Sequence, residues 1–255
     1  RDSDSHMLIV GNWKAYVESK VKAKALYAGA KRLSAKGKHE VVVAPSFPYI
    51  GMLSPAKSSS RGHGLAAQDV SVTVGGAQTG EVPAGALKDL GVSYVIVGHS
   101  ERRARGEDDA TVFEKARHAL AHGMTPILCV GETIRDADAQ YLKLVRAQVT
   151  ALMSVLTPKE RLATVIAYEP VWAIGKTDLE AIHPSDLREM VLYIRKVLAD
   201  VMPGTANQKV RILYGGSVDA TNARSLFEGT GIDGFLVGRA STDVAGFSAL
   251  VASVS

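Results

Sequence analysis

The sequence predicts an α/β fold, a single-domain (β/α)8 barrel, and three observations support this prediction. Eight short apolar runs rich in β-branched residues recur about every 25 to 45 residues, which is too far apart for an antiparallel meander. Most runs are continuously apolar, as expected for parallel strands covered on both faces. The stretches between them show helical periodicity, and a length of 255 residues suits one barrel. An open, doubly wound sheet is the alternative.

The apolar runs predict strands at residues 8–10, 40–44, 64–68, 94–97, 125–130, 164–168, 210–214 and 234–237. We assign residues 7–255 to the barrel. Residues 1–6, ahead of Met7, resemble the remnant of an expression tag, so we leave them out of the fold.

The intervening stretches carry helix signals. Two segments, Pro184-Ser185-Asp186 and Asp219-Ala220-Thr221, are typical of helix starts. A surface loop is predicted at residues 57–61, which contain only Lys, Ser and Arg. Helical spacing predicts buried faces for two helices, formed by Val21, Ala25 and Ala28 in the first and by Leu187, Met190, Val191, Ile194 and Leu198 in the sixth.

Composition excludes several classes of function. The chain is 46% hydrophobic and 22% charged, and no apolar run approaches the roughly 18 residues that span a bilayer. Its single cysteine, Cys129, excludes an internal disulfide and suits a reducing compartment, so we expect a cytoplasmic protein. The net charge of +4 is scattered among acidic residues, which argues against a nucleic-acid partner. The seven histidines are dispersed, so we expect no metal site.

Polar residues and glycines follow five of the predicted strands. In a barrel the carboxyl ends of the strands converge on one face, where active sites lie. Each residue alone has a common structural explanation; Lys14, for example, could simply pair with Glu101. Together they suit proton transfer beside the carbonyl of a phosphorylated substrate. The groups are Asn12 and Lys14, His99 and Glu101, Glu169, Gly215-Gly216-Ser217, and Gly238-Arg239.

Two nucleotide-binding motifs are incomplete. Gly175-Lys176-Thr177 resembles the end of a phosphate loop, but Pro170 stands where that motif needs a glycine. No Gly-x-Gly-x-x-Gly follows the first predicted strand, which argues against a dinucleotide cofactor.

The chain resembles the triosephosphate isomerase family, in register from Met7 to near its end. The specific motifs are Asn12-Trp13-Lys14, His99-Ser100-Glu101-Arg102-Arg103, Tyr168-Glu169-Pro170-Val171-Trp172-Ala173-Ile174-Gly175 and Tyr214-Gly215-Gly216-Ser217-Val218. The resemblance implies the TIM-barrel fold and a glycolytic and gluconeogenic isomerase. It would interconvert D-glyceraldehyde 3-phosphate and dihydroxyacetone phosphate without a cofactor.

The resemblance also implies roles for the residues that match. Glu169 would move a proton between two carbons, and His99, as a neutral imidazole, would polarise the carbonyl oxygen. Lys14 and Asn12 would stabilise the enediolate, with Glu101 orienting Lys14. Trp172 and Ile174 would belong to a lid that excludes water. The backbone N–H groups that would hold the phosphate are those of Gly175, Ser217, Gly238 and Arg239.

Two departures from the family pattern leave an alternative open. Arg239 stands where the family usually has glycine, and the lid continues after Gly175 with the unusual string Lys176-Thr177-Asp178. A barrel that binds a phosphosugar, catalyses poorly and serves as a scaffold therefore remains the second hypothesis. A third, an aldolase, needs a Schiff-base lysine or a metal set.

Residues 70–81 form a long connection for a barrel. In the resembled family this loop inserts into a second subunit beside Asn12 and Lys14 of that subunit. We therefore expect a homodimer formed through the loop around Gln78-Thr79. A flexible loop on a monomer is the alternative.

Overall fold

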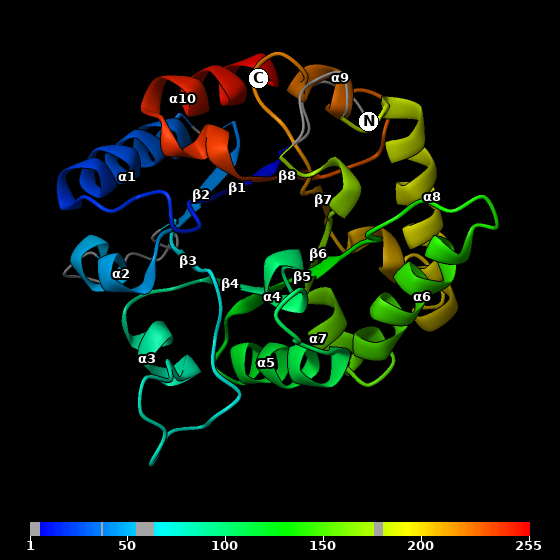
Figure 1. Cartoon of the computed structure of the whole chain (residues 1–255), viewed down its shortest axis with the longest axis horizontal. Helices are drawn as coiled ribbons and strands as arrows, with labels where there is room; N and C mark the ends of the chain where they lie inside the picture. The colour runs from blue at the N-terminus through cyan, green and yellow to red at the C-terminus, as the bar shows by residue number, and fades with distance from the viewer. Residues whose placement is uncertain (1–5, 37, 55–63, 176–180) are drawn as a thin grey trace.

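The computed structural model describes residues 6–36, 38–54, 64–175 and 181–255. In this part of the chain eight parallel strands form one sheet in the order β2-β1-β8-β7-β6-β5-β4-β3. A parallel bridge between Val43 and Leu65 joins the two ends of that order. Helices surround the strands (Figure 1). The predicted (β/α)8 barrel is confirmed, and the open sheet is excluded.

The strand positions follow the apolar runs of the sequence. Four strands, β2, β4, β5 and β8, have the predicted bounds. The strand β3 is the shortest. It pairs with β4 over two residues, and a single bridge connects this part of the chain to β2. The strands are β1 (Leu8–Asn12), β2 (Glu40–Ala44), β3 (Ala66–Ala67), β4 (Tyr94–Val97), β5 (Thr125–Val130), β6 (Val165–Tyr168), β7 (Ile212–Tyr214) and β8 (Gly234–Val237).

Each strand is followed by helical or 3-10 segments. Many begin with a side chain that accepts a backbone hydrogen bond, such as Ser19 before α1 and Asp108 before α5. The helices are α1 (Lys20–Ala35), α2 (Phe47–Leu53), α3 (Ala84–Asp89), α4 (Ser100–Arg103), α5 (Asp109–Ala121), α6 (Gln140–Met153), α7 (Pro158–Leu162), α8 (Pro184–Val201), α9 (Ala223–Phe227) and α10 (Val244–Ser253), with 3-10 turns η1 (Val171–Ala173), η3 (Ala206–Lys209) and η4 (Arg239–Thr242).

Two helix predictions need correction. The buried face of α8 is as predicted, but Val21, Ala25 and Ala28 are exposed on α1. The larger side chains of Leu26 and Tyr27 set the buried face of α1 instead, because burying them removes more apolar surface than burying alanines.

The predicted start at Asp219-Ala220-Thr221 is also early, since α9 begins at Ala223. The Asp219 carboxylate accepts from the Thr221 N–H at 2.7 Å and forms a turn before the helix. The loop predicted at 57–61, the residues 1–5 and the lid residues 176–180 lie outside the described residues.

The core has two layers. The larger packs the outer faces of the strands against the helices, and the smaller fills the barrel interior with side chains such as Leu8, Ile96 and Leu213. Since the interior is filled, small molecules have access only at the barrel ends. No helix in the described ranges has the length and apolarity needed to cross a bilayer.

The contact between β8 and β1 has no room for a side chain at Gly234. A Cβ there would lie 1.8 Å from the Leu8 carbonyl oxygen, and the φ of Gly234 is +148°. We expect Gly234→Ala to lower the free energy of unfolding by more than about 3 kcal/mol in urea denaturation. The control is Gly204→Ala, where φ is +78° and nothing lies within 4 Å. It should cost about 1 kcal/mol through backbone strain alone, and equal losses in the two variants would contradict the steric argument.

Candidate active site

A cavity of about 620 Å³ opens at the carboxyl ends of the strands. Its walls include seven of the predicted site residues, which are Asn12, Lys14, His99, Gly175, Ser217, Gly238 and Arg239. The other two, Glu101 and Glu169, are absent from the cavity wall and lie behind Lys14 and His99, which they contact. The structure therefore brings the whole predicted set together.

The carboxylate of Glu169 is buried directly behind the cavity wall, with the residue 1% exposed. Its Oε2 accepts a hydrogen bond from the Ser100 N–H at 2.9 Å. Its Oε1 lies 3.2 Å from His99 Nε2 but accepts no hydrogen bond of acceptable geometry from any described residue. A buried carboxylate with one oxygen free of donors is a strong candidate for a proton acceptor.

Two glycines make room for Glu169. They are Gly131, directly after β5, and Gly215, directly after β7, on either side of the end of β6. A Cβ on Gly131 would lie 1.8 Å from the Glu169 carbonyl oxygen, and one on Gly215 would lie 2.9 Å from Glu169 Cγ. The sheet continues through this row, since the Glu169 N–H donates to the Val130 carbonyl at 2.8 Å. The position of Glu169 therefore requires residues without side chains on both neighbouring strand ends.

A hydrogen bond to its Nδ1 defines the tautomer of His99. Its Nδ1 accepts a hydrogen bond from the Glu101 N–H at 3.2 Å, as the cap of α4. An Nδ1 that accepts carries no proton, so the ring proton is on Nε2. That nitrogen lies 3.2 Å from Glu169 Oε1, and His99 lines the cavity. His99 can therefore donate one hydrogen bond to a substrate oxygen.

Lys14 is held in a sparsely populated backbone conformation. Its φ is +47°, which is uncommon for a residue other than glycine. The side chains of Gln68 and Ser46 both donate to its carbonyl, at 2.8 and 3.0 Å, and stabilise this conformation. The Lys14 N–H donates to Asn12 Oδ1 at 3.0 Å, so the amide nitrogen of Asn12 remains available as a donor at the cavity.

The Lys14 ammonium pairs with Glu101 at 2.7 Å. Burial raises the pKa of Glu101, but the hydrogen bond and charge of Lys14 outweigh it, so that pKa lies below its ordinary value. The pair keeps the ammonium at the cavity wall with its other two protons free to donate.

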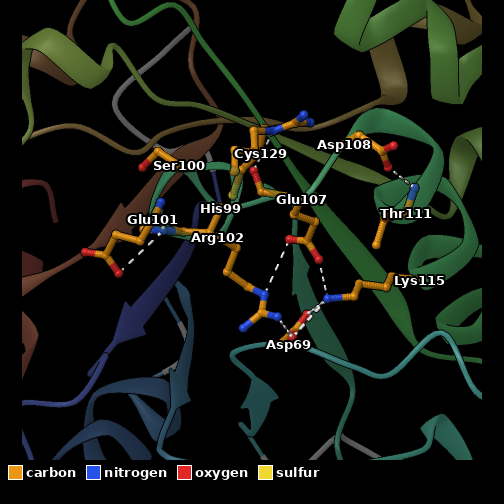
Figure 2. A network of polar contacts seen from close by, with 12 residues as sticks. Asp69, His99, Ser100, Glu101, Arg102, Glu107, Asp108, Thr111, Lys115 and Cys129 are labelled. Atoms are coloured by element: carbon orange, nitrogen blue, oxygen red, sulfur yellow. Dashed lines mark hydrogen bonds and ion pairs between the residues drawn. The ribbon is translucent and has the colours of Figure 1, made fainter. Parts of the chain in front are cut away.

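An ion cluster that the sequence did not predict anchors α4. Arg102 of this helix pairs with Asp69 and Glu107, and both acids also pair with Lys115 of α5 (Figure 2). Burial raises the pKa of Asp69 despite the two cations. The cluster fixes the segment that carries His99 and Glu101. No sequence spacing reveals it, because its members come from two helices and two separate loops.

Glu132 anchors the start of the predicted lid. Its Oε1 accepts from Tyr168 Oη at 2.9 Å and from Trp172 Nε1 at 2.8 Å, and Glu132 is fully buried. The Arg135 guanidinium pairs with the same oxygen and lies 5.3 Å from the Trp172 ring centre. Burial and the charge of Glu132 raise the pKa of Tyr168. Sequence reasoning assigned no role to Glu132, since it precedes its partners by about forty residues.

The part of the cavity lined by Gly238 and Arg239 suits an anion. Within the described ranges, the backbone N–H groups of Gly238 and Arg239 donate to no protein group. A Cβ on Gly238 would lie 3.9 Å from Lys14 Nζ, so these amides lie close to the ammonium. Ser217 and Gly175 line the same cavity. The described residues hold no cluster of three or more His, Cys, Asp or Glu that could bind a metal.

Comparison with known proteins gives one consistent result. The sequence model of a protein family described as triosephosphate isomerase matches residues 7–254. A protein named triosephosphate isomerase from Thermus thermophilus is 42% identical over 247 residues, which cover 96% of this chain and 97% of the relative. Relatives of the same name from Roseiflexus castenholzii and Chloroflexus aurantiacus are also 42% identical, and each alignment covers 96% of this chain.

Removing the Glu132 carboxylate should destabilise the protein, because the hydroxyl of Tyr168, the indole N–H of Trp172 and the charge of Arg135 would lose their partner. We expect Glu132→Ala to lower the free energy of unfolding by about 3 kcal/mol or more. Glu132→Gln keeps one acceptor oxygen and should lose roughly half as much. Urea denaturation measures both, and a loss below about 0.5 kcal/mol in Glu132→Ala would show that the contacts are unimportant.

Proposed function

The chain belongs to the triosephosphate isomerase family, and we propose how its residues divide the work of that reaction. The enzyme interconverts D-glyceraldehyde 3-phosphate and dihydroxyacetone phosphate by proton transfer through an enediolate. One observation carries the assignment: the buried carboxylate of Glu169 contacts His99, whose Nδ1 accepts a hydrogen bond, beside a cavity that also presents Lys14 and Asn12. This complete set supports an active isomerase over a barrel that only binds phosphosugars.

Glu169 is the base that removes a proton from the carbon next to the carbonyl and returns it to the neighbouring carbon. Its Oε1 has no donor to displace, and a single N–H from Ser100 holds Oε2. Because Glu169 is 1% exposed, the carboxylate must rotate toward the cavity to reach a substrate carbon.

His99 donates its Nε2 proton toward the carbonyl oxygen and moves a proton between the two oxygens of the enediolate. A neutral imidazole is suited to this, since it donates at Nε2 while its Nδ1 stays bound to the Glu101 N–H. The Lys14 ammonium and the Asn12 amide stabilise the negative charge that develops on those oxygens. Glu101 orients Lys14 through their 2.7 Å ion pair.

The phosphate is held by the backbone N–H groups of Gly175, Ser217, Gly238 and Arg239. Support comes from the unpaired amides of Gly238 and Arg239 and from their closeness to Lys14. Trp172 and Ile174 belong to the lid. Ile174 lines the cavity, and Glu132 holds Trp172, so the segment has one fixed end next to Glu169. Closing it would exclude water from the enediolate.

We further propose that the protein is a homodimer formed through residues 70–81. The base of this loop is closed by the Ser71 N–H donating to the Val82 carbonyl at 3.0 Å. Its outer part projects from the barrel between β3 and α3 (Figure 1), and Val74 is 85% exposed there. An apolar side chain on a projecting, closed loop suits insertion into a second copy. A cytoplasmic location is consistent with the single buried Cys129, which needs no oxidising compartment.

Glu169→Gln tests the base. The amide keeps the size of the side chain but accepts no proton, so kcat should fall by about 10³-fold or more. Binding of a phosphate-bearing competitive inhibitor should change by less than about threefold, because the phosphate is held elsewhere. Coupled steady-state assays measure the first quantity and inhibition constants the second. Full kcat in the variant would disprove the assignment.

Val74→Asp tests the loop interface. A charge at the tip should weaken the dimer by roughly tenfold to a thousandfold, because a desolvated carboxylate without a partner is costly. The control is Val155→Asp, which places the same charge at another exposed valine. Sedimentation across a concentration series measures both. A wild-type protein that sediments as a monomer would refute the proposal, as would equal effects of the two substitutions.

A further inference from the structure

Three positively charged or chargeable side chains line the cavity, and they differ in their partners. The Lys14 ammonium pairs with Glu101, and the His99 ring lies beside Glu169. Arg239 has no carboxylate within ion-pair distance anywhere in the described ranges. No carboxylate in the described ranges therefore neutralises the charge of Arg239, which can interact with a bound anion.

The Arg239 side chain contacts an aromatic ring. Its Cζ lies 5.7 Å from the centre of the Tyr16 ring, and Tyr16 lines the same cavity. A cation near a ring face is attracted by the electron-rich face of the ring, which favours one position of the side chain. The ring accepts none of the five guanidinium N–H groups in a conventional hydrogen bond, so the planar fork remains available for phosphate oxygens.

Backbone geometry places this pair next to the phosphate amides. Tyr16 follows Lys14 by two residues, and Arg239 follows Gly238, whose Cβ position would be 3.7 Å from Lys14 Cε. A phosphate on the amides of Gly238 and Arg239 thus has Lys14 on one side and the Arg239 side chain within its reach.

Two acids line this end of the cavity without neutralising Arg239. Asp219 is engaged by the N–H of Thr221 at 2.7 Å, and Asp243 by the N–H of Gly246 at 2.6 Å, where it caps α10. They would repel an anion that had only backbone amides to bind. A side-chain cation offsets that repulsion, which gives Arg239 a purpose that glycine at the same position could not serve.

We propose that Tyr16 positions the Arg239 guanidinium at the phosphate end of the cavity, where it binds the substrate's phosphate in addition to the backbone amides. Tyr16 is the positioning residue and Arg239 the contact. This inference rests on the proposed placement of the phosphate. It assigns a specificity role to two side chains: they favour substrates and inhibitors that carry a phosphate dianion over those with a single negative charge.

A double-mutant cycle over Tyr16→Leu and Arg239→Gly tests the pair. Each single variant should raise KM and the inhibition constant of inorganic phosphate by about threefold to tenfold, with kcat within about twofold, because the contact is made equally in the ground and transition states. The double variant should be no weaker than Arg239→Gly alone, since Tyr16 acts only through Arg239. Tyr16→Phe keeps the ring and should bind phosphate as the wild type does.

The matched control is Arg224→Ala, which removes one exposed positive charge from α9, outside the residues that line the cavity. It should leave both constants unchanged. Additive losses in the double variant, or unchanged constants in Tyr16→Leu, would overturn the positioning role. Tighter phosphate binding in Arg239→Gly would show that the side chain obstructs the site.

The same full-length variants are then compared without turnover. Inorganic phosphate is titrated into each, and 31P NMR measures its affinity. Loss of phosphate affinity in Tyr16→Leu and its return in Tyr16→Phe would support the pair even if Glu169→Gln kept full kcat. Equal phosphate affinity in all variants, with normal isomerase turnover, would refute the pair and leave the assignment of Glu169 intact.

Discussion

The site depends on the row of residues directly after β5, β6 and β7, where a carboxylate lies between two glycines. Glu169 continues the sheet through its N–H bond to the Val130 carbonyl, and Gly131 and Gly215 leave the space that its backbone and side chain occupy. A methyl group at either glycine would displace the base. The position of Glu169 is thus set by the parallel register of β5, β6 and β7.

Polar contacts hold the remaining parts of the site. Nearby hydrogen bonds and ion pairs offset the backbone strain and the desolvation of charges there. Lys14 has a strained φ, and two side-chain donors to its carbonyl stabilise it. The segment carrying His99 is tied down by the pairing of Asp69 with the partly exposed Arg102 and the buried Lys115. Such pairs add little net stability, because desolvation opposes the attraction between the charges. Their benefit is a single position for the groups that face the substrate.

The sequence was sufficient for the barrel and for the cavity wall, because both follow from short-range patterns. Apolar runs mark the strands, and strands in a barrel bring their ends together, which is why Glu169 and His99 were predicted to meet. Features that depend on tertiary packing could not be predicted from the sequence. The exposed Val21 has the helical spacing of a buried residue, and only the competing bulk of Leu26 decides the face. The partners of Glu132 are likewise set by tertiary contacts.

Glu132 holds the chain on both sides of Glu169. Its single oxygen binds the last residue of β6, Tyr168, and the lid residue Trp172, so the chain on both sides of Glu169 is fixed. Between them Pro170, with φ of −67°, limits the backbone. The Glu169 carboxylate, in contrast, accepts one hydrogen bond of good geometry within the described part of the chain, from the Ser100 N–H. In the function proposed above, this side chain would therefore reach the substrate by rotation while its backbone stays in place.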